Sequence, residues 1–288
     1  MMTIGDLINE YENDLTEAGI SDARFDIIEI LSSVLDTSPS NLMLKLDKEI
    51  DRDITDPLIE RLKNNEPVCY ILGKAYFFNE EYKVGKGVLI PRPDTEVLVE
   101  KAYEVIEKSG NRSPIIWDLC TGTGCVGISL GNLLLKNGII PTIYLVEKSD
   151  EALEYTYINI DQSNCKDKIK IVKLDVLKDM DKISTEQPDF IVSNPPYITS
   201  ADMKTLDSSV KDYEPEQALF GITDDGLLFY EKMASYAAEN LSDGGAIIVE
   251  HGYDQADSVK GIFEKNGLED AQSFKDYGGN MRVTLAYK

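Results

Sequence analysis

Four consecutive residues, Asn194-Pro195-Pro196-Tyr197, carry groups suited to holding a flat amino or amide group. The two prolines fix their φ angles and lack backbone donors, which leaves the Asn194 side-chain oxygen and the Pro195 carbonyl free to accept hydrogen bonds. Two such acceptors can bind both hydrogens of one planar NH2 group, and Tyr197 can cover its flat face. The segment therefore predicts a site that orients a weakly nucleophilic nitrogen, with a rigid proline turn capped by Asn194 as the structural alternative.

A glycine-rich segment, Asp118–Gly127, is a second candidate for chemistry. Gly122, Gly124 and Gly127 satisfy the GxGxxG pattern, and the segment follows a predicted strand and opens a predicted helix. Glycines let the backbone turn sharply and come close to a ligand. The segment therefore predicts the binding of a nucleotide-like cofactor, with a tight turn alone as the alternative.

Two acidic residues follow the next strands of the same predicted sheet. Glu147 ends the second strand, where a carboxylate can hold ribose hydroxyls. Asp175 follows the third strand, where it can accept from an adenine amino group or act only as a turn cap. Either a dinucleotide or S-adenosyl-L-methionine (AdoMet) fits this pattern, and the sulfonium of AdoMet tolerates the nearby Asp118. Together with Asn194, the pattern favours methyl transfer to nitrogen without a strong general base.

Composition excludes several classes of function. The 288 residues include 52 Asp and Glu against 29 Lys and Arg, and the net charge of −23 favours small molecules or a basic protein partner over nucleic acid. The single histidine, His251, excludes most Ser-His-Asp and Cys-His mechanisms and is expected to be a strand-end residue of the core or the rim, not a catalyst. The four cysteines lack CxxC spacing, so we expect reduced thiols, no metal site and a cytoplasmic location. No signal peptide or membrane-spanning segment is expected.

The first 66 residues predict a small helical bundle. The first helix has these apolar residues at helical spacing: Ile4, Leu7, Ile8, Tyr11 and Leu15. The second helix is expected to begin at an N-cap on Ser21 and to carry one apolar stripe: Phe25, Ile28, Leu31 and Leu35. A short third helix is expected at Pro57–Asn64, with Pro57 in its first turn.

The remaining residues predict a hairpin followed by a larger α/β domain. Residues 76–90 alternate as strands do, with a turn near Asn79–Glu81, and a helix follows over Pro91–Ser109 with Asp94 or Thr95 near its cap. From Pro114 onward, strands and helices alternate, which is typical of a doubly wound, mostly parallel sheet. The expected strands are Ile115–Leu119, Thr142–Glu147, Ile169–Leu174, Phe190–Ser193, Ala246–Glu250 and Arg282–Tyr287. The expected helices are near Gly124–Lys136, Asp150–Gln162 and Leu227–Asn240.

Several motifs together resemble one known family. The strongest stretches are Glu66–Gly73 (EPVCYILG), Val88–Glu96 (VLIPRPDTE), Asp118–Gly124 (DLCTGTG) and Ser193–Ile198 (SNPPYI). Weaker matches are Tyr213–Gly221, Glu250–Gln255 and Gly278–Val283. In this order they resemble the PrmC/HemK family, the protein-(glutamine-N5) methyltransferases that modify peptide chain release factors.

The resemblance implies a Rossmann-like, AdoMet-dependent methyltransferase fold with a seven-stranded, mostly parallel sheet. The implied organisation is a helical substrate-docking domain over residues 1–75, a hairpin linker over 76–90 and the methyltransferase domain over 91–288. The implied activity is methylation of the glutamine side-chain amide in the Gly-Gly-Gln motif of release factors, in a protein expected to be a monomer that binds no nucleic acid directly.

The resemblance also assigns roles to residues. Asn194 and Pro195 would hold the glutamine amide beside Pro196 and Tyr197, and Arg92 and Thr95 would shape the rim or serve only as salt bridge and cap. The cofactor would contact Asn194 and the following residues: Cys120, Thr121, Gly122, Thr123, Gly124, Glu147, Asp175 and Val176.

Three other functions fit parts of the sequence. An adenine-N6 DNA or RNA amino-methyltransferase would use the same Asn-Pro-Pro-Tyr chemistry on a flipped base, but the acidic composition counts against it. A nicotinamide-dependent dehydrogenase would use GxGxxG and leave Asn194–Tyr197 unexplained. A non-enzymatic AdoMet sensor would bind the cofactor without turnover.

Overall fold

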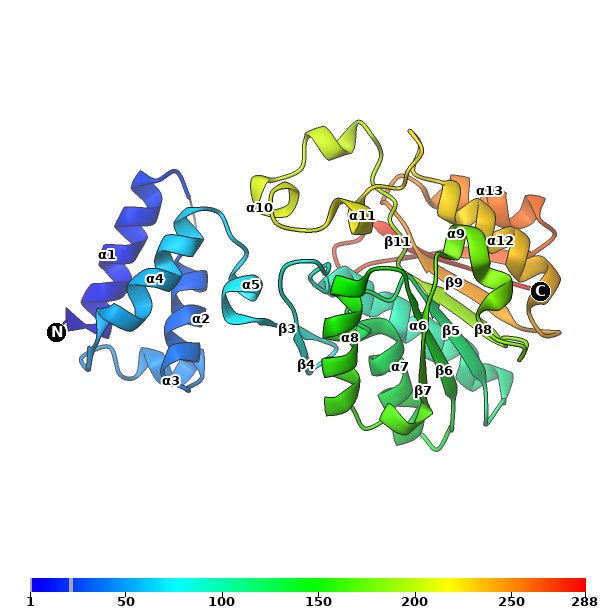
Figure 1. The fold of residues 1–288 in the computed structure, drawn as a ribbon, viewed down its shortest axis with the longest axis horizontal. Helices are drawn as coiled ribbons and strands as arrows, with labels where there is room; N and C mark the ends of the chain where they lie inside the picture. Colours follow the sequence, from blue (N-terminus) through cyan, green and yellow to red (C-terminus); the bar gives the residue numbers. More distant parts are fainter. Residues whose placement is uncertain (1, 21–22) are drawn as a thin grey trace. The chain divides into compact units, whose positions relative to one another are not determined.

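The computed structural model describes residues 2–20 and 23–288, and the chain divides into two compact units (Figure 1). The first comprises Met1–Lys74 with Asp207–Tyr213, and the second comprises Ala75–Leu206 with Glu214–Lys288. Asp207–Tyr213 lies inside the expected methyltransferase domain but groups with the N-terminal helices, where the Tyr213 hydroxyl donates to the Asn64 carbonyl (2.6 Å). In the described part of the chain, every helix is too short or too polar to cross a membrane.

The first unit is a bundle of helices with a short two-stranded ribbon. β1 (Met2–Thr3) pairs antiparallel with β2 (Glu49–Ile50). The helices are α1 (Ile4–Glu17), α2 (Arg24–Val34), α3 (Pro39–Met43), α4 (Arg52–Lys63), α5 (Val68–Leu72) and α10 (Ser208–Lys211). The Thr3 side chain caps α1 by accepting from the Asp6 N–H, and α1 buries all five of its expected apolar residues.

The predicted apolar stripe of α2 is only partly confirmed, since Leu31 is buried and Ile28 packs against the core. The helix buries Ile27, Ile30 and Leu31, whereas Phe25 is 85% exposed and Leu35 is 39% exposed. Because α2 carries apolar residues on more than one side, helical spacing alone does not decide which side faces the core. Its expected cap, Ser21, lies outside the described residues.

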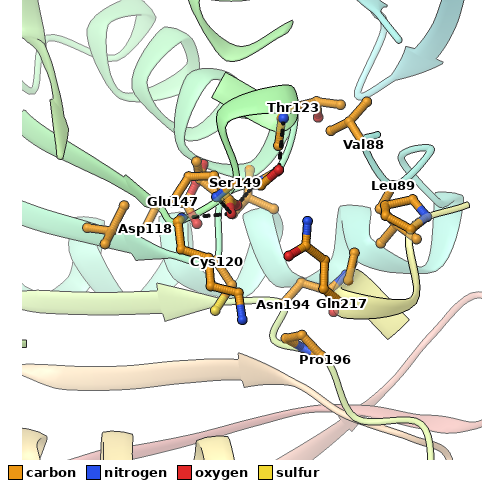
Figure 2. A pocket seen from close by; sticks show the side chains of 18 of the residues that line it. Val88, Leu89, Asp118, Cys120, Thr123, Glu147, Ser149, Asn194, Pro196 and Gln217 are labelled. Atoms are coloured by element: carbon orange, nitrogen blue, oxygen red, sulfur yellow. Dashed lines mark hydrogen bonds between the residues drawn. The ribbon is translucent and has the colours of Figure 1, made fainter. Parts of the chain in front are cut away.

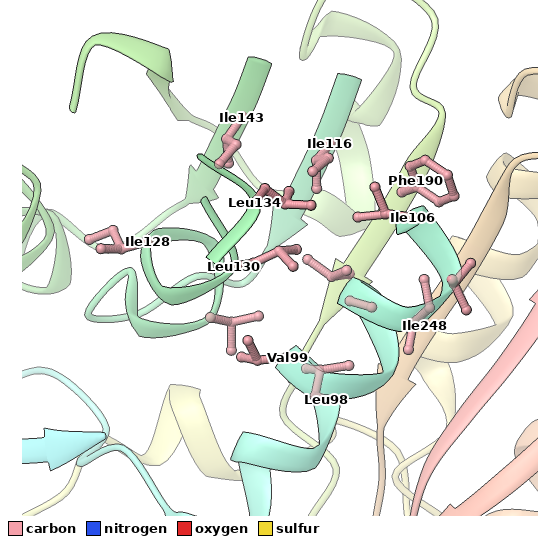
Figure 3. Close-up of a cluster of buried hydrophobic side chains, with 14 of the residues drawn as sticks. Leu98, Val99, Ile106, Ile116, Ile128, Leu130, Leu134, Ile143, Phe190 and Ile248 are labelled. Carbon is pink, nitrogen blue, oxygen red and sulfur yellow. The ribbon is translucent and has the colours of Figure 1, made fainter. Parts of the chain in front are cut away.

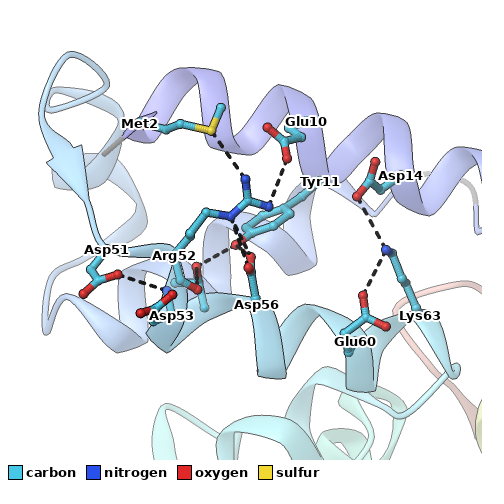
Figure 4. Close-up of polar contacts among 11 residues, drawn as sticks. Met2, Glu10, Tyr11, Asp14, Asp51, Arg52, Asp53, Asp56, Glu60 and Lys63 are labelled. Atoms are coloured by element: carbon cyan, nitrogen blue, oxygen red, sulfur yellow. Dashed lines mark hydrogen bonds and ion pairs between the residues drawn. The ribbon is translucent and has the colours of Figure 1, made fainter.

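The predicted third helix begins earlier than expected. α4 starts after Asp51, whose side chain accepts from the Asp53 N–H, so Pro57 lies in the helix interior and not in its first turn. Contacts with α1 hold this upstream part of α4 (Figure 4). Arg52 pairs with Glu10 of α1 (3.0 Å), and the Tyr11 hydroxyl donates to Asp56 of α4 (2.6 Å). We infer that these tertiary contacts offset the backbone hydrogen bond lost at proline.

The hairpin consists of β3 (Lys74–Phe77) and β4 (Glu80–Lys83). Its turn is Phe78–Asn79, where both residues have positive φ (51° and 62°), slightly earlier than the expected Asn79–Glu81. Side chains of α7 (Cys125–Lys136) and α8 (Asp150–Gln162) hold it: Tyr82 bonds Ser129 (2.6 Å), and the Lys83 N–H donates to Asn159 (2.7 Å).

The main sheet of the second unit has seven strands within residues 75–288, in the order β10-β11-β9-β8-β5-β6-β7. β9, β8, β5, β6 and β7 pair in parallel, and β11 runs antiparallel to β9 and β10. The strands are β5 (Ile115–Leu119), β6 (Thr142–Glu147), β7 (Ile169–Lys173), β8 (Phe190–Ser193), β9 (Ala246–Glu250), β10 (Glu269–Lys275) and β11 (Met281–Tyr287). The expected mostly parallel α/β fold is therefore confirmed, with each expected strand present to within one residue.

Helices cover both faces of this sheet (Figure 1). α6 (Glu96–Ser109) and α7 pack on one face, and α12 (Leu228–Asn240) and α13 (Ala256–Lys265) pack on the other. Aliphatic side chains from α6, α7 and the strands fill the first of these interfaces (Figure 3). The short helices are η1 (Pro93–Thr95), η2 (Lys166–Lys168), α9 (Val176–Asp179), η3 (Met180–Lys182), η4 (Asp202–Lys204) and α11 (Glu216–Leu219).

Two elements near the C-terminus, α13 and β10, were not predicted from the sequence. β10 buries mainly Ala271, its backbone reaches positive φ at Asp270 (52°), and its register with β11 is irregular. An edge strand with so few buried residues lacks the alternation that identifies a strand.

Candidate active site

A pocket opens at the carboxyl ends of the parallel strands of the second unit, with about 890 Å³ of empty space including its open mouth. The segments after β5, β6, β7 and β8 contribute walls, as expected where parallel strands end at one edge. The predicted site residues that line it are Cys120, Thr121, Gly122, Thr123, Glu147, Asp175, Val176, Asn194 and Pro196. Figure 2 shows Asn194, Pro196 and Gln217 grouped apart from Glu147 and Ser149.

The turn after β5 depends on backbone conformations with positive φ. Cys120 (59°), Gly122 (56°) and Gly124 (84°) adopt them in alternation along the turn. Gly127 has a different role, because a Cβ there would lie 2.3 Å from Leu145 Cδ2. Gly122 therefore shapes the pocket wall, Gly124 begins α7, and Gly127 lets α7 pack closely on the sheet.

The Glu147 carboxylate is held by backbone groups at the end of β6. Oε2 accepts from the Gly122 N–H (3.0 Å), and Oε1 accepts from the N–H groups of Lys148 (2.8 Å) and Ser149 (2.9 Å). A carboxylate offers about four lone-pair positions, so one is left beyond these three bonds. The arrangement fixes a negatively charged acceptor on the pocket wall, where it can take a ribose hydroxyl.

A second carboxyl, Asp118, lies in β5 behind this turn. It is fully buried, and its Oδ2 accepts from the Thr121 hydroxyl (2.5 Å) and the Gly127 N–H (2.9 Å). Burial raises the pKa of Asp118 to about 7, although both hydrogen bonds act in the opposite direction. Asp118 thus couples the turn to the start of α7 and reaches the pocket wall.

Asp175 caps α9 at the far end of the pocket, beside Val176. Its carboxylate accepts from the Leu177 N–H (3.1 Å) and forms an ion pair with Lys178 (2.9 Å). Burial raises the pKa of Asp175, but these contacts outweigh it and hold the pKa below the ordinary value. The carboxylate therefore remains a charged acceptor at neutral pH, next to the apolar surface of Val176.

Asn194 is held at the end of β8 by a distant side chain. Its Nδ2 donates to Thr95 Oγ1 (3.1 Å), and Thr95 is buried. The Asn194 oxygen therefore lies on the other edge of the carboxamide, where it can accept from a bound group. Thr95 is the N-cap residue of α6, as expected, although its side chain makes no capping hydrogen bond. Arg92 and Thr95 both line the pocket.

Three predicted site residues are not among those that line the pocket. Gly124 caps α7, Pro195 is buried, and the Tyr197 hydroxyl donates to Glu250 Oε1 (3.3 Å). Burial is the main reason that the pKa of Tyr197 is raised. The placement of Tyr197 does not support the expected contact with the flat face of the substrate, and the role of the Pro195 carbonyl stays a prediction.

Sequence reasoning missed the wall contributed by residues 214–218. Pro215, Gln217 and Ala218 line the pocket, and an ion pair between Glu214 and Arg92 holds their segment near the loop after the hairpin. The Glu214 side chain is only 1% exposed, and its Oε2 also accepts from the Ile90 N–H (3.1 Å). The family resemblance includes both the stretch with Arg92 and the stretch with Glu214. No local pattern, however, indicates that these residues, 122 positions apart, form a pair.

His251 is buried as expected and lies outside the pocket. One ring nitrogen bonds the Gly252 carbonyl (2.8 Å), the other bonds Thr284 (2.9 Å), and burial lowers the pKa of His251. Within residues 2–20 and 23–288, no group of three or more His, Cys, Asp or Glu is placed to hold a metal ion.

The donor set of the pocket fits AdoMet better than a dinucleotide. Three carboxyls, Asp118, Glu147 and Asp175, reach its walls. Carboxylates attract the ammonium and sulfonium groups of AdoMet and repel a pyrophosphate. Val176 and Leu174 supply apolar surface beside Asp175, as an adenine ring requires.

Comparisons with known proteins identify the family to which the chain is similar. The PrmC N-terminal domain family matches residues 6–73, and the methyltransferase small domain family matches residues 94–211. A release factor glutamine methyltransferase of Clostridium botulinum is 38% identical over 290 residues, covering 100% of both chains. One of Thermodesulfovibrio yellowstonii is 39% identical and covers 80% of each chain. The solved catalytic domain of hMettl16, in complex with a MAT2A 3′UTR hairpin, shares the fold (TM-score 0.55, 20% identity, 72% and 74% coverage).

Proposed function

The chain belongs to the family of release factor glutamine methyltransferases, and we propose that its pocket methylates the side-chain N5 of the Gly-Gly-Gln glutamine in a release factor. The observation that carries this proposal is that one pocket contains both an oriented carboxamide acceptor, Asn194, and a carboxylate suited to ribose, Glu147. A methyl donor and an amide can therefore meet in one site.

The cofactor is AdoMet, which supplies a methyl carbon activated by its sulfonium. Glu147 would bind the ribose hydroxyls, and the backbone from Cys120 to Gly124 would follow the amino-acid part of the cofactor. Asp175 and Val176 would border the adenine. Because backbone N–H groups already hold the Glu147 carboxylate, little rearrangement is needed when the cofactor binds.

Asn194 would supply the decisive contact with the substrate. An amide nitrogen is a poor nucleophile because its lone pair is delocalised into the carbonyl. Acceptance of one N–H by Asn194 Oδ1, and of the other by the Pro195 carbonyl, would orient the nitrogen and stabilise the positive charge that develops on it. AdoMet would supply the methyl carbon, with its sulfur as the leaving group, and the alkylated nitrogen would lose the proton that its positive charge makes acidic.

The charge of the chain supports a basic protein as substrate. At −23, the protein attracts a cationic partner over long distances and disfavours direct nucleic-acid binding. We further propose that the helical unit of residues 1–75 docks the release factor, that the protein acts as a monomer, and that it modulates translation termination in the cytoplasm. The free cysteines agree with a reducing location.

Mass spectrometry tests the proposal directly. A purified release factor is incubated with this protein and AdoMet, digested, and searched for one added methyl group on the motif glutamine. The control is a release factor whose motif glutamine is replaced by alanine. A methyl group on the intact factor and none on the control is the expected result. Methylation of duplex DNA or RNA in place of the release factor would support the adenine amino-methyltransferase alternative.

A further inference from the structure

A buried glutamine outside the pocket joins three loops of the second unit. Gln255 is only 6% exposed and ends the stretch Glu250–Gln255, which the family resemblance includes. Its Nε2 donates to the carbonyls of Tyr197 (3.1 Å) and Asp225 (3.0 Å), and its Oε1 accepts from the Gly252 N–H (2.9 Å). Three of the four hydrogen bonds that a carboxamide can make are therefore made with backbone groups of different loops.

These partners fix which edge of the Gln255 carboxamide faces which loop. Two carbonyl oxygens can bind only the NH2 edge, and an N–H group can bind only the oxygen. A glutamate at this position would keep an acceptor for Gly252 but would place an oxygen against both carbonyls. The position therefore requires a group that donates on one edge and accepts on the other.

The first of the two carbonyls belongs to the turn that contains Asn194. Pro195 and Pro196 have no N–H, so this part of the turn can be held only through carbonyls and side chains. Thr95 holds the Asn194 side chain at the start of the turn (3.1 Å), and the buried glutamine holds the Tyr197 carbonyl at its end. Because the prolines fix φ at the two positions in between, a movement of the Tyr197 carbonyl displaces the Pro195 carbonyl as well.

The second carbonyl belongs to the segment that also supplies the pocket wall of residues 215–218. This segment pairs with the chain just after the turn, where the Ile198 N–H donates to the Leu219 carbonyl (2.9 Å). Farther along the segment, a Cβ at Gly226 would lie 2.2 Å from the Tyr197 carbonyl oxygen. The turn and the wall segment are therefore in direct contact, and the buried glutamine binds a carbonyl of each.

We propose that Gln255 is a positioning residue for methyl transfer, which holds the turn against the wall segment and thereby places the Asn194 and Pro195 acceptors for the substrate amide. Both acceptors must bind one NH2 group, so a small displacement of either one misaligns the nitrogen with the methyl carbon. Gln255 acts through these two residues and does not touch the substrate itself. The inference rests on the proposed function, because it assigns the support of the same acceptor site.

The test compares two substitutions of this glutamine. Gln255→Met removes every hydrogen bond of the side chain, whereas Gln255→Glu keeps the acceptor for Gly252 and loses both donors. We measure kcat on the release factor at saturating AdoMet and the Kd of S-adenosylhomocysteine. In both variants kcat should fall about 10-fold, and the Kd should change by less than about threefold, because the contacts of Glu147 are unaffected. The KM for the release factor should change less than kcat.

Asn159→Leu is the matched control for lost stability. Asn159 is also buried, at 4% exposed, and accepts from the Lys83 N–H (2.7 Å) while donating to the carbonyls of Lys83 (3.1 Å) and Thr123 (3.0 Å). It therefore makes the same three kinds of hydrogen bond, but at the hairpin and the cofactor turn. Asn159→Leu should lower the denaturant midpoint about as much as Gln255→Met and leave kcat at saturating AdoMet within about threefold of the unaltered protein.

Three results would overturn the inference. A wild-type kcat in Gln255→Glu would show that the bond to Gly252 is the one that matters. An equal loss of kcat in Asn159→Leu and Gln255→Met would reduce Gln255 to a contribution to stability, as would a loss of S-adenosylhomocysteine binding in Gln255→Glu that matches its loss of rate. If the unaltered protein leaves the release factor unmethylated, the proposed function fails, which is a separate outcome read before any variant is compared.

Discussion

The two halves of the pocket are held in different ways. At the cofactor half, backbone groups fix the Glu147 carboxylate, and positive φ angles at Cys120 and Gly122 shape the turn. At the acceptor half, the buried Thr95 side chain holds Asn194 by accepting from its Nδ2 (3.1 Å). The cofactor half is thus defined by the chain path, whereas the acceptor half depends on individual side chains that single substitutions can remove.

Each half also contains a buried carboxyl group whose pKa is raised to about 7. Asp118 at the cofactor half has two hydrogen bonds to its Oδ2, whereas Glu250 at the acceptor half has an oxygen without a partner among the described residues. We infer that Asp118 serves the structure of the turn, whereas Glu250 holds the Tyr197 hydroxyl at the end of β9. Substitutions in the two halves should therefore separate cofactor binding from turnover.

The largest effect is expected for Asn194→Ala. The variant loses the acceptor that orients the amide in the transition state, so we expect kcat to fall by about 100-fold to 1000-fold. The Kd of S-adenosylhomocysteine, measured by calorimetry, should change by less than about threefold, because Glu147 and its backbone contacts are unaffected. A wild-type rate in this variant would show that Asn194 does not act in the mechanism. The acceptor half would then not differ from the cofactor half in its effect on turnover.

The converse effect is expected for Glu147→Ala. Loss of a charged acceptor for the ribose should weaken S-adenosylhomocysteine binding by about 10-fold to 100-fold. At saturating AdoMet, kcat should fall far less than in Asn194→Ala. Glu147→Asp is the matched control, since it retains the charge and shortens the side chain by one methylene. Unchanged affinity in Glu147→Ala would contradict the ribose assignment.

The raised pKa of Asp118 predicts how the stability of the protein depends on pH. Its pKa is about 7 in the folded protein against an ordinary value of 3.8, so the folded state binds the proton more tightly than the unfolded state. The stability that this group contributes is present at low pH and is lost as the pH rises toward 7. Between pH 5 and 7, the unfolding free energy should therefore fall by about 2 kcal/mol less in Asp118→Asn than in the unaltered protein.

Denaturant unfolding at several pH values measures this decline. Asp243→Asn, at an exposed carboxyl in the turn before β9, is the matched control and should leave the pH dependence as it is. An identical pH profile for Asp118→Asn and the unaltered protein would show that Asp118 is not the group responsible. The raised pKa of Glu250 makes stability fall with rising pH in the same way. In Asp118→Asn, the dependence of the unfolding free energy on pH should therefore become weaker without disappearing.

The smallest effect is expected on the surface of the helical unit. Phe25 is 85% exposed and Leu44 is 82% exposed, so both present apolar surface that is available to a protein partner. If this unit docks the release factor, Phe25→Asp with Leu44→Asp should raise the KM for the release factor several-fold and leave the KM for AdoMet unchanged. Tyr157→Asp, at a 58% exposed residue of α8, is the control. Equal effects from the double variant and from Tyr157→Asp would argue against docking through Phe25 and Leu44.

The sequence predicted those parts of the site that local patterns encode. Each parallel strand ends beside the residue expected there, including Glu147 and Asn194, because strand ends and turns leave short-range signals. The support behind Asn194 was not predictable, since Thr95 lies 99 residues away in the chain and its hydroxyl was expected to cap a helix. The position of Tyr197 was missed for a similar reason, because the buried Glu250 that accepts a hydrogen bond from its hydroxyl belongs to another strand.

A structure with S-adenosylhomocysteine bound would show whether the cofactor and the amide can meet beside Asn194. The ribose hydroxyls are expected to bind Glu147. The sulfur, which marks where the methyl group departs, is expected to face the Asn194 carboxamide oxygen across space sufficient for one amide. A ligand whose sulfur points away from Asn194, or whose ribose lies at another wall, would show that this pocket does not bring the two together.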